Sequence, residues 1–130
     1  MRVGIAGYGV VGKTRHISIE KNTPFQIIAV SESNKETQKD IPAGIEIFDT
    51  YQDLIAGAEL DIIFISLPNK FASEATSLSL QKGLHVFCEK PPAKTLSELI
   101  NVQNILSKHP SLKLMYGFNH RFHLSVEEAK

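Results

Sequence analysis

The chain has 130 residues, among them 14 basic residues, 14 acidic residues and one cysteine. This length fits a single domain that buries enough apolar surface to fold without disulfides or a metal. The zero formal net charge offers no basic surface for nucleic acid or an anionic membrane, and no apolar run approaches the roughly 18 residues of a membrane span. The single cysteine, Cys88, cannot form an internal disulfide, so a small buried thiol and a cytoplasmic location are expected.

Short strand-like runs alternate with longer helical patterns along the chain. In chain order we predict a strand over 2–6, a helix over 11–21, strands over 25–31 and 45–48, a helix over 51–56, a strand over 61–67, a helix over 71–82, a strand over 85–88, a helix over 95–108 and a strand over 112–116. Strands that alternate with helices are parallel and joined by right-handed crossovers. Strands that are almost continuously apolar lie in a sheet covered on both faces. The predicted fold is therefore α/β, a doubly wound parallel sheet in three α/β/α layers, with ligands expected at the carboxyl ends of the strands.

The helix over 95–108 has the clearest boundary signals. Thr95 is a predicted N-cap, and Glu98 stands three residues later, as in a capping box. Gly83 is expected to end the preceding helix, and Ser125 is a predicted N-cap for a last helix that begins at 125–130. The apolar face predicted for 95–108 consists of Leu96, Leu99, Ile100, Val102, Gln103, Ile105 and Leu106.

Between the first strand and the first helix lies a glycine-rich turn, Gly7-Tyr8-Gly9-Val10-Val11-Gly12. It matches G-x-G-x-x-G in the strand–turn–helix context that the dinucleotide-binding fingerprint requires. Gly7 permits the tight turn, Gly9 lets the backbone approach a pyrophosphate, and Gly12 lets the helix pack closely on the strand. The N–H groups and dipole of the helix favour the phosphate charge. We therefore predict that these six residues bind NAD or NADP; the alternative is a plain glycine turn in another α/β domain.

Glu32 ends the second predicted strand, 20 residues after Gly12. An acidic residue at this position accepts hydrogen bonds from the hydroxyls of the adenosine ribose. Its carboxylate repels a 2′-phosphate, which favours NAD. If Glu32 turned aside, the following Ser33, Asn34 and Lys35 would accept NADP. The alternative is a solvated loop glutamate.

Two further segments follow strands at the same predicted edge. After the fourth strand come Leu67, Pro68 and Asn69, where Asn69 either caps the next helix or contacts the cofactor. After the fifth come Glu89-Lys90-Pro91-Pro92, where a lysine beside a carboxylate can donate a hydrogen bond to a reacting hydroxyl or carbonyl. The bond before Pro91 or Pro92 is a candidate for the cis form, which would fix the direction of the lysine. The alternative is a solvated lysine in a polar loop.

No metal site is predicted. His120 and His123 are three residues apart, but the sequence shows no third ligand to complete a site.

Together these motifs resemble the cofactor-binding domain of the Gfo/Idh/MocA oxidoreductase family. The resemblance covers essentially the whole chain. It is carried by the turn 7–12, Glu32, Tyr51-Gln52-Asp53-Leu54, Leu67-Pro68-Asn69, the segment 83–91 and Gly117-Phe118-Asn119-His120-Arg121-Phe122. It implies a Rossmann fold and an oxidoreductase that transfers hydride between NAD, or NADP, and a sugar, a sugar derivative or a nucleotide sugar.

The resemblance also implies roles for particular residues. Lys90 lies beside the nicotinamide and the reacting carbon and is the predicted catalytic residue. Glu89, Asn119 and Arg121 are predicted to lie close to the cofactor. In one departure from the family, Ala72 stands where many members have a histidine, three residues after the asparagine of the Pro-Asn pair.

Family members continue into a second domain that holds the substrate. The resemblance therefore divides the chain into an NAD(P)-binding domain over 1–124 and, over 125–130, the start of a helix leading to a substrate domain absent from this sequence. We expect the chain alone to be inactive or nearly so, with an apolar sheet face or edge exposed and a possible homo-oligomer. Two alternatives are a module that senses NAD(P) without catalysis and a half-enzyme completed by another chain.

Overall fold

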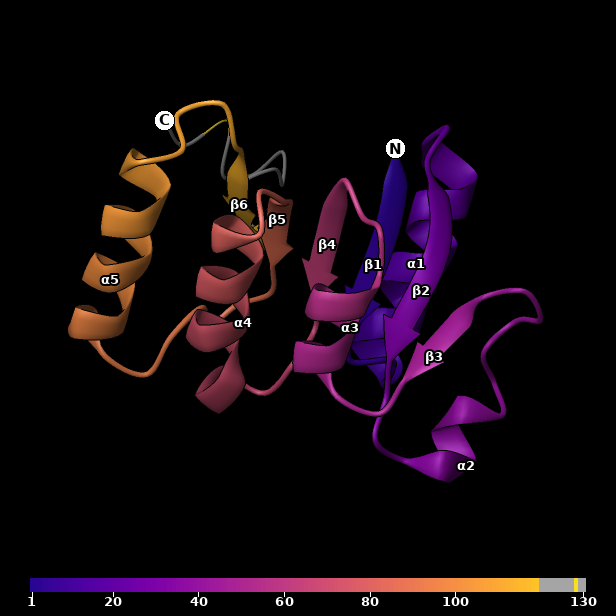
Figure 1. Cartoon of the computed structure of the whole chain (residues 1–130). Coiled ribbons are helices and arrows are strands. Elements are labelled where there is room, and N and C mark those ends of the chain that lie inside the picture. The colour runs from indigo at the N-terminus through magenta and orange to yellow at the C-terminus, as the bar shows by residue number, and fades with distance from the viewer. Residues whose placement is uncertain (120–127, 129–130) are drawn as a thin grey trace.

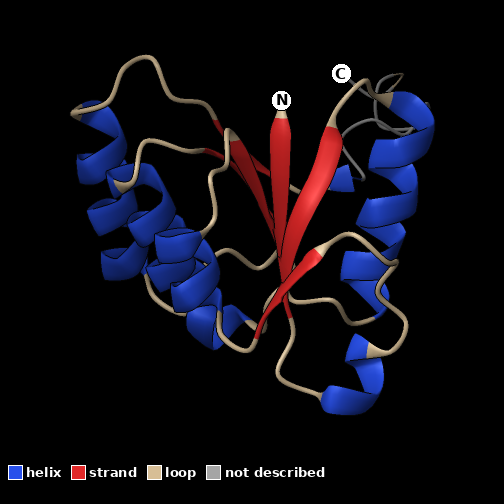
Figure 2. Ribbon diagram, turned by 45° about the vertical axis from the view of Figure 1, so that its right-hand side comes forward, coloured by secondary structure: helices blue, strands red, loops and turns tan. Residues whose placement is uncertain are grey.

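Six parallel strands form one sheet in the order β3-β2-β1-β4-β5-β6. The computed structural model describes residues 1–119 and 128. Its elements in chain order are β1 (Arg2–Ala6), α1 (Val10–Asn22), β2 (Gln26–Ser31), α2 (Lys35–Gln38), β3 (Glu46–Phe48), α3 (Tyr51–Gly57), β4 (Ile62–Ile65), α4 (Asn69–Gln81), β5 (His85–Cys88), α5 (Leu96–Ser107) and β6 (Leu114–Tyr116). Helices cover the sheet on both sides (Figures 1 and 2). The predicted doubly wound α/β fold is confirmed.

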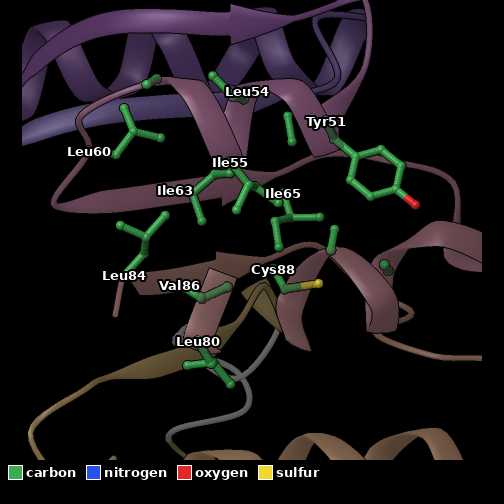
Figure 3. Close-up of a cluster of buried hydrophobic side chains, with 14 of the residues drawn as sticks. Tyr51, Leu54, Ile55, Leu60, Ile63, Ile65, Leu80, Leu84, Val86 and Cys88 are labelled. Carbon is green, nitrogen blue, oxygen red and sulfur yellow. The ribbon is translucent and has the colours of Figure 1, made fainter. Parts of the chain in front are cut away.

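The face of the sheet under α3 and α4 holds the larger core. Alternate side chains of β4 and β5 point to this face, because successive residues of a strand face opposite sides. They pack against α3 and α4, and α5 packs on α4 through the buried Val102. Cys88 is fully buried here, as predicted for a small apolar residue. Figure 3 shows this cluster, which includes Leu54, Ile63, Ile65, Leu80, Val86 and Cys88.

The opposite face of the sheet is only partly covered by α1. A row of aligned residues crosses it from Ile5 on β1 through Phe64 and Phe87 to Met115 on β6. Ile5 is fully buried, but Met115 at the end of the row is 47% exposed. Phe64 and Phe87 stack with their ring centroids 5.2 Å apart and are half-buried. This row is in line with the exposed apolar sheet face expected from the sequence.

Helix ends follow local chemistry, with two differences from prediction. Gly83, at φ +87°, ends α4 in a Schellman motif, because its N–H bonds to the Leu80 carbonyl and the Leu84 N–H to that of Ser79. However, α4 begins at Asn69, two residues before the predicted start. The short helix α2 was not predicted. Asn34 caps it by accepting hydrogen bonds from the N–H groups at 36 and 37.

Thr95 caps α5 as predicted, by accepting a hydrogen bond from the Glu98 N–H. The Glu98 carboxylate reaches back one residue further than a capping box requires, to the Lys94 N–H at 2.8 Å. The predicted apolar face of this helix is partly wrong: Leu96 is 72% exposed and Ile100 47% exposed. Helical spacing alone predicts an apolar face that is too wide, because α5 contacts α4 along a narrow strip that buries chiefly Val102.

Some expectations fall on residues outside the described part of the chain. These are the cap at Ser125, the boundary at 124/125, the pair His120 and His123, and Arg121. Within the described residues, no helix is both long and apolar enough to cross a membrane. Over the same residues, no group of three or more His, Cys, Asp or Glu side chains is arranged to hold a metal ion.

Candidate functional site

A cavity of about 520 Å³ opens at the carboxyl edge of the sheet. Its walls come from the glycine turn, from the ends of β2, β3 and β4, and from the first turns of α3 and α4. The strand order reverses direction between β1 and β4, so the cavity lies at the switch point where doubly wound sheets bind ligands. Four segments that are distant in sequence therefore surround one hollow.

The glycine turn has the geometry predicted for a dinucleotide fingerprint. Gly7 has φ +87°, and a Cβ there would lie 2.7 Å from the Ser66 carbonyl oxygen of the neighbouring strand end. A Cβ on Gly12 would lie 2.0 Å from the Gly7 carbonyl oxygen. A Cβ on Gly9 would have nothing within 4 Å, and Gly9 caps α1 without a side-chain hydrogen bond. The N-terminus of α1 is thus open to a phosphate group, with the exposed Val10 on its first turn.

Tyr8 can serve a ligand only through its backbone. Its side chain is 3% exposed and packs in the core under α1. The phenol oxygen is 2.8 Å from His16 Nδ1, and His16 Nε2 lies 3.1 Å from a Glu20 carboxylate oxygen. The Tyr8 side chain therefore anchors the glycine turn to α1 from within the core.

Glu32 is held against the glycine turn. One carboxylate oxygen accepts a hydrogen bond from the Tyr8 N–H at 3.1 Å, and the other accepts one from the Asn34 N–H at 2.8 Å. The side chain is half-buried and lines the cavity. A carboxylate oxygen has more than one lone pair, so both oxygens can accept further hydrogen bonds from a ligand in the cavity.

A second acidic residue, Asp49, lines the cavity at the end of β3. Its carboxylate accepts hydrogen bonds from Lys35 Nζ at 2.5 Å and from Gln38 Nε2 at 2.9 Å. These bonds, the one from Lys35 first, hold the pKa of Asp49 below its usual range. Gln38 also donates to the Glu32 carbonyl, so α2 ties the ends of β2 and β3 together.

The segment after β4 forms the opposite wall. Leu67 and Pro68 line the cavity, and a Cβ on Gly7 would lie 3.2 Å from Leu67 Cδ2. Asn69 is the first residue of α4 and is exposed, while Pro68 occupies the N-cap position without a side-chain hydrogen bond. The capping alternative for Asn69 is therefore wrong.

Tyr51 and Phe71 form an aromatic wall with ring centroids 5.9 Å apart. Burial, followed by a hydrogen bond to Glu74, raises the pKa of Tyr51 to about 12.

Glu89 is paired with a residue that sequence reasoning missed. Its carboxylate lies 2.5 Å from the Arg15 guanidinium, and both side chains are at most 20% exposed. The Arg15 guanidinium carbon also stands 4.9 Å from the centroid of the Phe87 ring. A Cβ on Gly117 would lie 2.8 Å from the other Glu89 oxygen, so a larger residue at position 117 would displace this carboxylate. The pair joins α1 to the end of β5.

Lys90, next to this pair, is exposed and follows a strand that pairs with β4. The bond between Lys90 and Pro91 is cis. It is one of the two bonds that were candidates for the cis form from the sequence. The cavity is not lined by Lys90. Asn119 lies 3.5 Å from the Arg15 guanidinium through its side-chain oxygen, and Arg121 lies outside the described residues.

The residues of this edge that the sequence did not single out include Arg15, Asp49, Phe71 and Gly117. Arg15 and Asp49 carry no motif, because an ion pair between distant segments has no local signature. Gly117 lies in the segment that carries the family resemblance, but its role became visible only with the position of the Glu89 carboxylate.

Comparison with known proteins gives the same domain. The profile of Gfo/Idh/MocA, described as an oxidoreductase family with an NAD-binding Rossmann fold, matches residues 1–118. D-glucoside 3-dehydrogenase of Escherichia coli is 28% identical, over 100% of this chain and 38% of its own length. D-xylose 1-dehydrogenase (NADP(+)) 2 of Haloferax volcanii is 28% identical, over 98% of this chain and 39% of its own.

Among solved structures, scyllo-inositol dehydrogenase from Lactobacillus casei with bound NAD(H) and scyllo-inositol is similar with a TM-score of 0.89. It is 27% identical, and the match covers 99% of this chain and 39% of that one. The chain thus spans about two fifths of the length of these relatives. Because the family profile matches through the glycine turn, the cavity walls and the Glu89–Lys90 segment, this chain belongs to the Gfo/Idh/MocA oxidoreductase family, of which it forms the NAD-binding Rossmann domain.

Proposed function

We propose that the chain is the cofactor-binding part of a dehydrogenase that transfers hydride between NAD and a hydroxyl-bearing carbon of a sugar, sugar derivative or nucleotide sugar. The bound cofactor supplies the hydride chemistry, while the protein supplies binding and orientation. The observation that carries the proposal is the Glu32 carboxylate, held at the cavity wall beside an open glycine turn. Relatives named as dehydrogenases of a glucoside, of xylose and of scyllo-inositol support the substrate class.

Each wall of the cavity suits one part of the dinucleotide. The N-terminus of α1 at Gly9 would hold the pyrophosphate, because the helix dipole and the N–H groups favour negative charge. Glu32 would accept hydrogen bonds from the adenosine ribose. Leu67 and Pro68 give an apolar wall on the β4 side.

Lys90 is the proposed catalytic residue. It follows β5, whose end is adjacent to the end of β4, and its exposed side chain is available to a substrate. Lys90 Nζ would hold or move the proton of the reacting hydroxyl. Glu89 instead faces Arg15, so its part is to position the turn that carries Lys90. Asn119 and Arg121 are proposed to contact the cofactor from the segment after β6.

NAD is the preferred cofactor in this proposal. The Glu32 carboxylate repels a 2′-phosphate, and two backbone N–H groups keep it in place. Lys35, the nearby cation that would accept the 2′-phosphate of NADP if Glu32 turned aside, is paired with Asp49.

We further propose that substrate binding requires residues beyond this cavity. The relatives are more than twice as long, which supports a division into a cofactor domain over 1–124 and the start of a connecting helix over 125–130. The chain alone would then be inactive or nearly so, and a homo-oligomer would assemble through the second domain. The single cysteine of the chain, Cys88, is free and buried, which supports a cytoplasmic location.

Titration of the chain with NADH and NADPH, followed by nicotinamide fluorescence, tests the proposal. We expect saturable binding with tighter affinity for NADH. Replacing Glu32 by Ala should weaken NADH binding about 10- to 100-fold, since a hydrogen bond to a charged group contributes about 1.5–3 kcal/mol. Binding of neither dinucleotide would contradict the proposed function. Turnover of a sugar with NAD by the chain alone would contradict the proposal that it is inactive by itself.

A further inference from the structure

We infer that Asp49, at the end of β3, is a second determinant of cofactor choice, because it holds Lys35 in an ion pair and so withholds that cation from the 2′-phosphate of NADP. The inference rests on the proposed function, in which the adenosine ribose lies against Glu32. It assigns a role in cofactor choice to Asp49, which no sequence motif identifies. It also predicts that removing the Asp49 charge improves the binding of NADP.

The geometry puts Asp49 beside the ribose position. Asp49 and Glu32 line the same cavity, together with Ser33. Gln38 Nε2 bonds both to the Asp49 carboxylate at 2.9 Å and to the Glu32 carbonyl at 2.5 Å. A phosphate added to the ribose 2′-oxygen would therefore face two carboxylates, one from the end of β2 and one from the end of β3.

Three lysines near this end of the cavity each form an ion pair with an acidic residue. Lys35 pairs with Asp49 at 2.5 Å, Lys13 with Asp40 at 2.5 Å, and Lys39 with Glu36 at 2.7 Å. With Glu32 added, these groups sum to four negative and three positive charges. A 2′-phosphate carries a charge near −1.5 to −2 at neutral pH, so it meets a local negative excess.

Of these three pairs, only Lys35–Asp49 involves a residue that lines the cavity. Both of its side chains are more than 60% exposed, so removing the pair by mutation costs the fold little. Removing the Asp49 charge should have two effects in the same direction: it takes one negative charge away from the phosphate, and it releases Lys35 towards it.

The test is the ratio of the dissociation constants for NADPH and NADH, measured on the whole chain. Asp49→Asn removes the charge and keeps the shape. We expect the ratio to fall about three- to fivefold at low ionic strength, the upper part of the range for one exposed charge pair, and the fall to shrink at about 1 M salt. Adding Lys35→Met to Asp49→Asn should cancel most of the gain, because the released cation is then absent.

Asp40→Asn is the matched control. It removes one carboxylate from an exposed pair of the same 2.5 Å length and releases Lys13, but neither residue lines the cavity. We expect this variant to leave the NADPH-to-NADH ratio within about twofold of wild type. Thermal unfolding of every variant verifies the fold, and Asp49→Ser is a second variant without the charge.

The possible outcomes separate the two proposals. If wild type binds NADH but Asp49→Asn leaves the ratio unchanged, the inference is overturned and the proposed function stands. The inference is also overturned if Lys35→Met does not cancel the gain, or if Asp40→Asn produces the same gain. If wild type binds neither dinucleotide, the proposed function fails and the inference fails with it.

Discussion

The two halves of the sheet edge differ in how much of a site they contain. At β1, β2 and β3, the glycine turn, Glu32 and Asp49 enclose a cavity, and hydrogen bonds hold both acids in place. At β5, the Arg15–Glu89 pair supports a turn whose lysine, Lys90, is exposed and does not line that cavity. The first half is built to bind and the second to present a group, so affinity for the cofactor and catalysis should be separable by mutation.

The largest expected effect breaks the binding half at Gly12. Gly12→Ala would put a methyl 2.0 Å from the Gly7 carbonyl oxygen, and the backbone must shift to relieve that overlap. We expect the free energy of unfolding in urea to fall by about 3 kcal/mol or more.

Gly9→Ala is the matched comparison, because a Cβ there meets no atom within 4 Å. Its stability should stay within about 1 kcal/mol of wild type, while NADH affinity falls at least about tenfold, since the methyl occupies the approach of the pyrophosphate. Equal stability losses in the two variants would contradict these distinct roles.

A second effect concerns Cys88, the buried last residue of β5, two residues before Lys90. Burial raises the pKa of the Cys88 thiol from 9.0 to about 11. The thiol therefore keeps its proton to a higher pH in the folded state than in the unfolded state. Its contribution to the free energy of unfolding is fully present below about pH 9 and is lost as the pH rises towards 11. The loss attributable to this thiol is at most about 3 kcal/mol.

Unfolding in urea at several pH values, for wild type and Cys88→Ala, measures this loss. The variant should lack this part of the decline, while the parts due to tyrosines remain in both proteins. Parallel pH profiles would show that the thiol is not the titrating group.

A third, smaller effect tests the support of the Lys90 turn. Arg15→Met keeps an apolar side chain near Phe87 but leaves the Glu89 carboxylate, 12% exposed, without its partner. We expect a loss of about 2 kcal/mol in unfolding free energy, between the values for exposed and buried pairs.

The control is Lys13→Met, two residues away on the same helix, whose pair with Asp40 is more exposed. It should cost under about 1 kcal/mol. Adding Glu89→Gln to Arg15→Met should recover part of the loss, because no uncompensated charge then remains. Failure of this recovery would indicate that the contact with Phe87, rather than the charge, supports the turn.

The smallest expected change in binding comes from Lys90→Met. NADH affinity should stay within about twofold of wild type, as for an exposed residue outside the cavity. Activity on a sugar, measured after joining the chain to the substrate domain of a relative, should fall by about 100-fold or more, since Lys90 handles the proton. Lys94→Met, an exposed lysine of the same loop, should change neither quantity. Full activity in Lys90→Met would show that Lys90 is not the catalytic residue, whereas a wild-type fusion without activity would favour a domain that binds NAD without catalysis.

Local patterns in the sequence were sufficient for the architecture and for much of the cavity. The alternation of strands and helices predicted the parallel sheet, because it depends on periodicity that each segment carries by itself. The glycine turn, the Thr95 cap and the Gly83 helix end also depend on residues that are adjacent in the chain. Glu32 was predictable because it follows the turn at a fixed distance in a βαβ unit.

Only the tertiary structure decided which distant groups meet. Arg15 and Glu89 are 74 residues apart, and Lys35 reaches Asp49 from a helix that no pattern predicted. Any of the 14 acidic residues could have partnered these cations as far as the sequence shows, because long-range ion pairs depend on strand order and helix placement. The same reason applies to α5, whose apolar spacing was visible but whose buried side, at Val102 rather than Leu96, was set by its contact with α4.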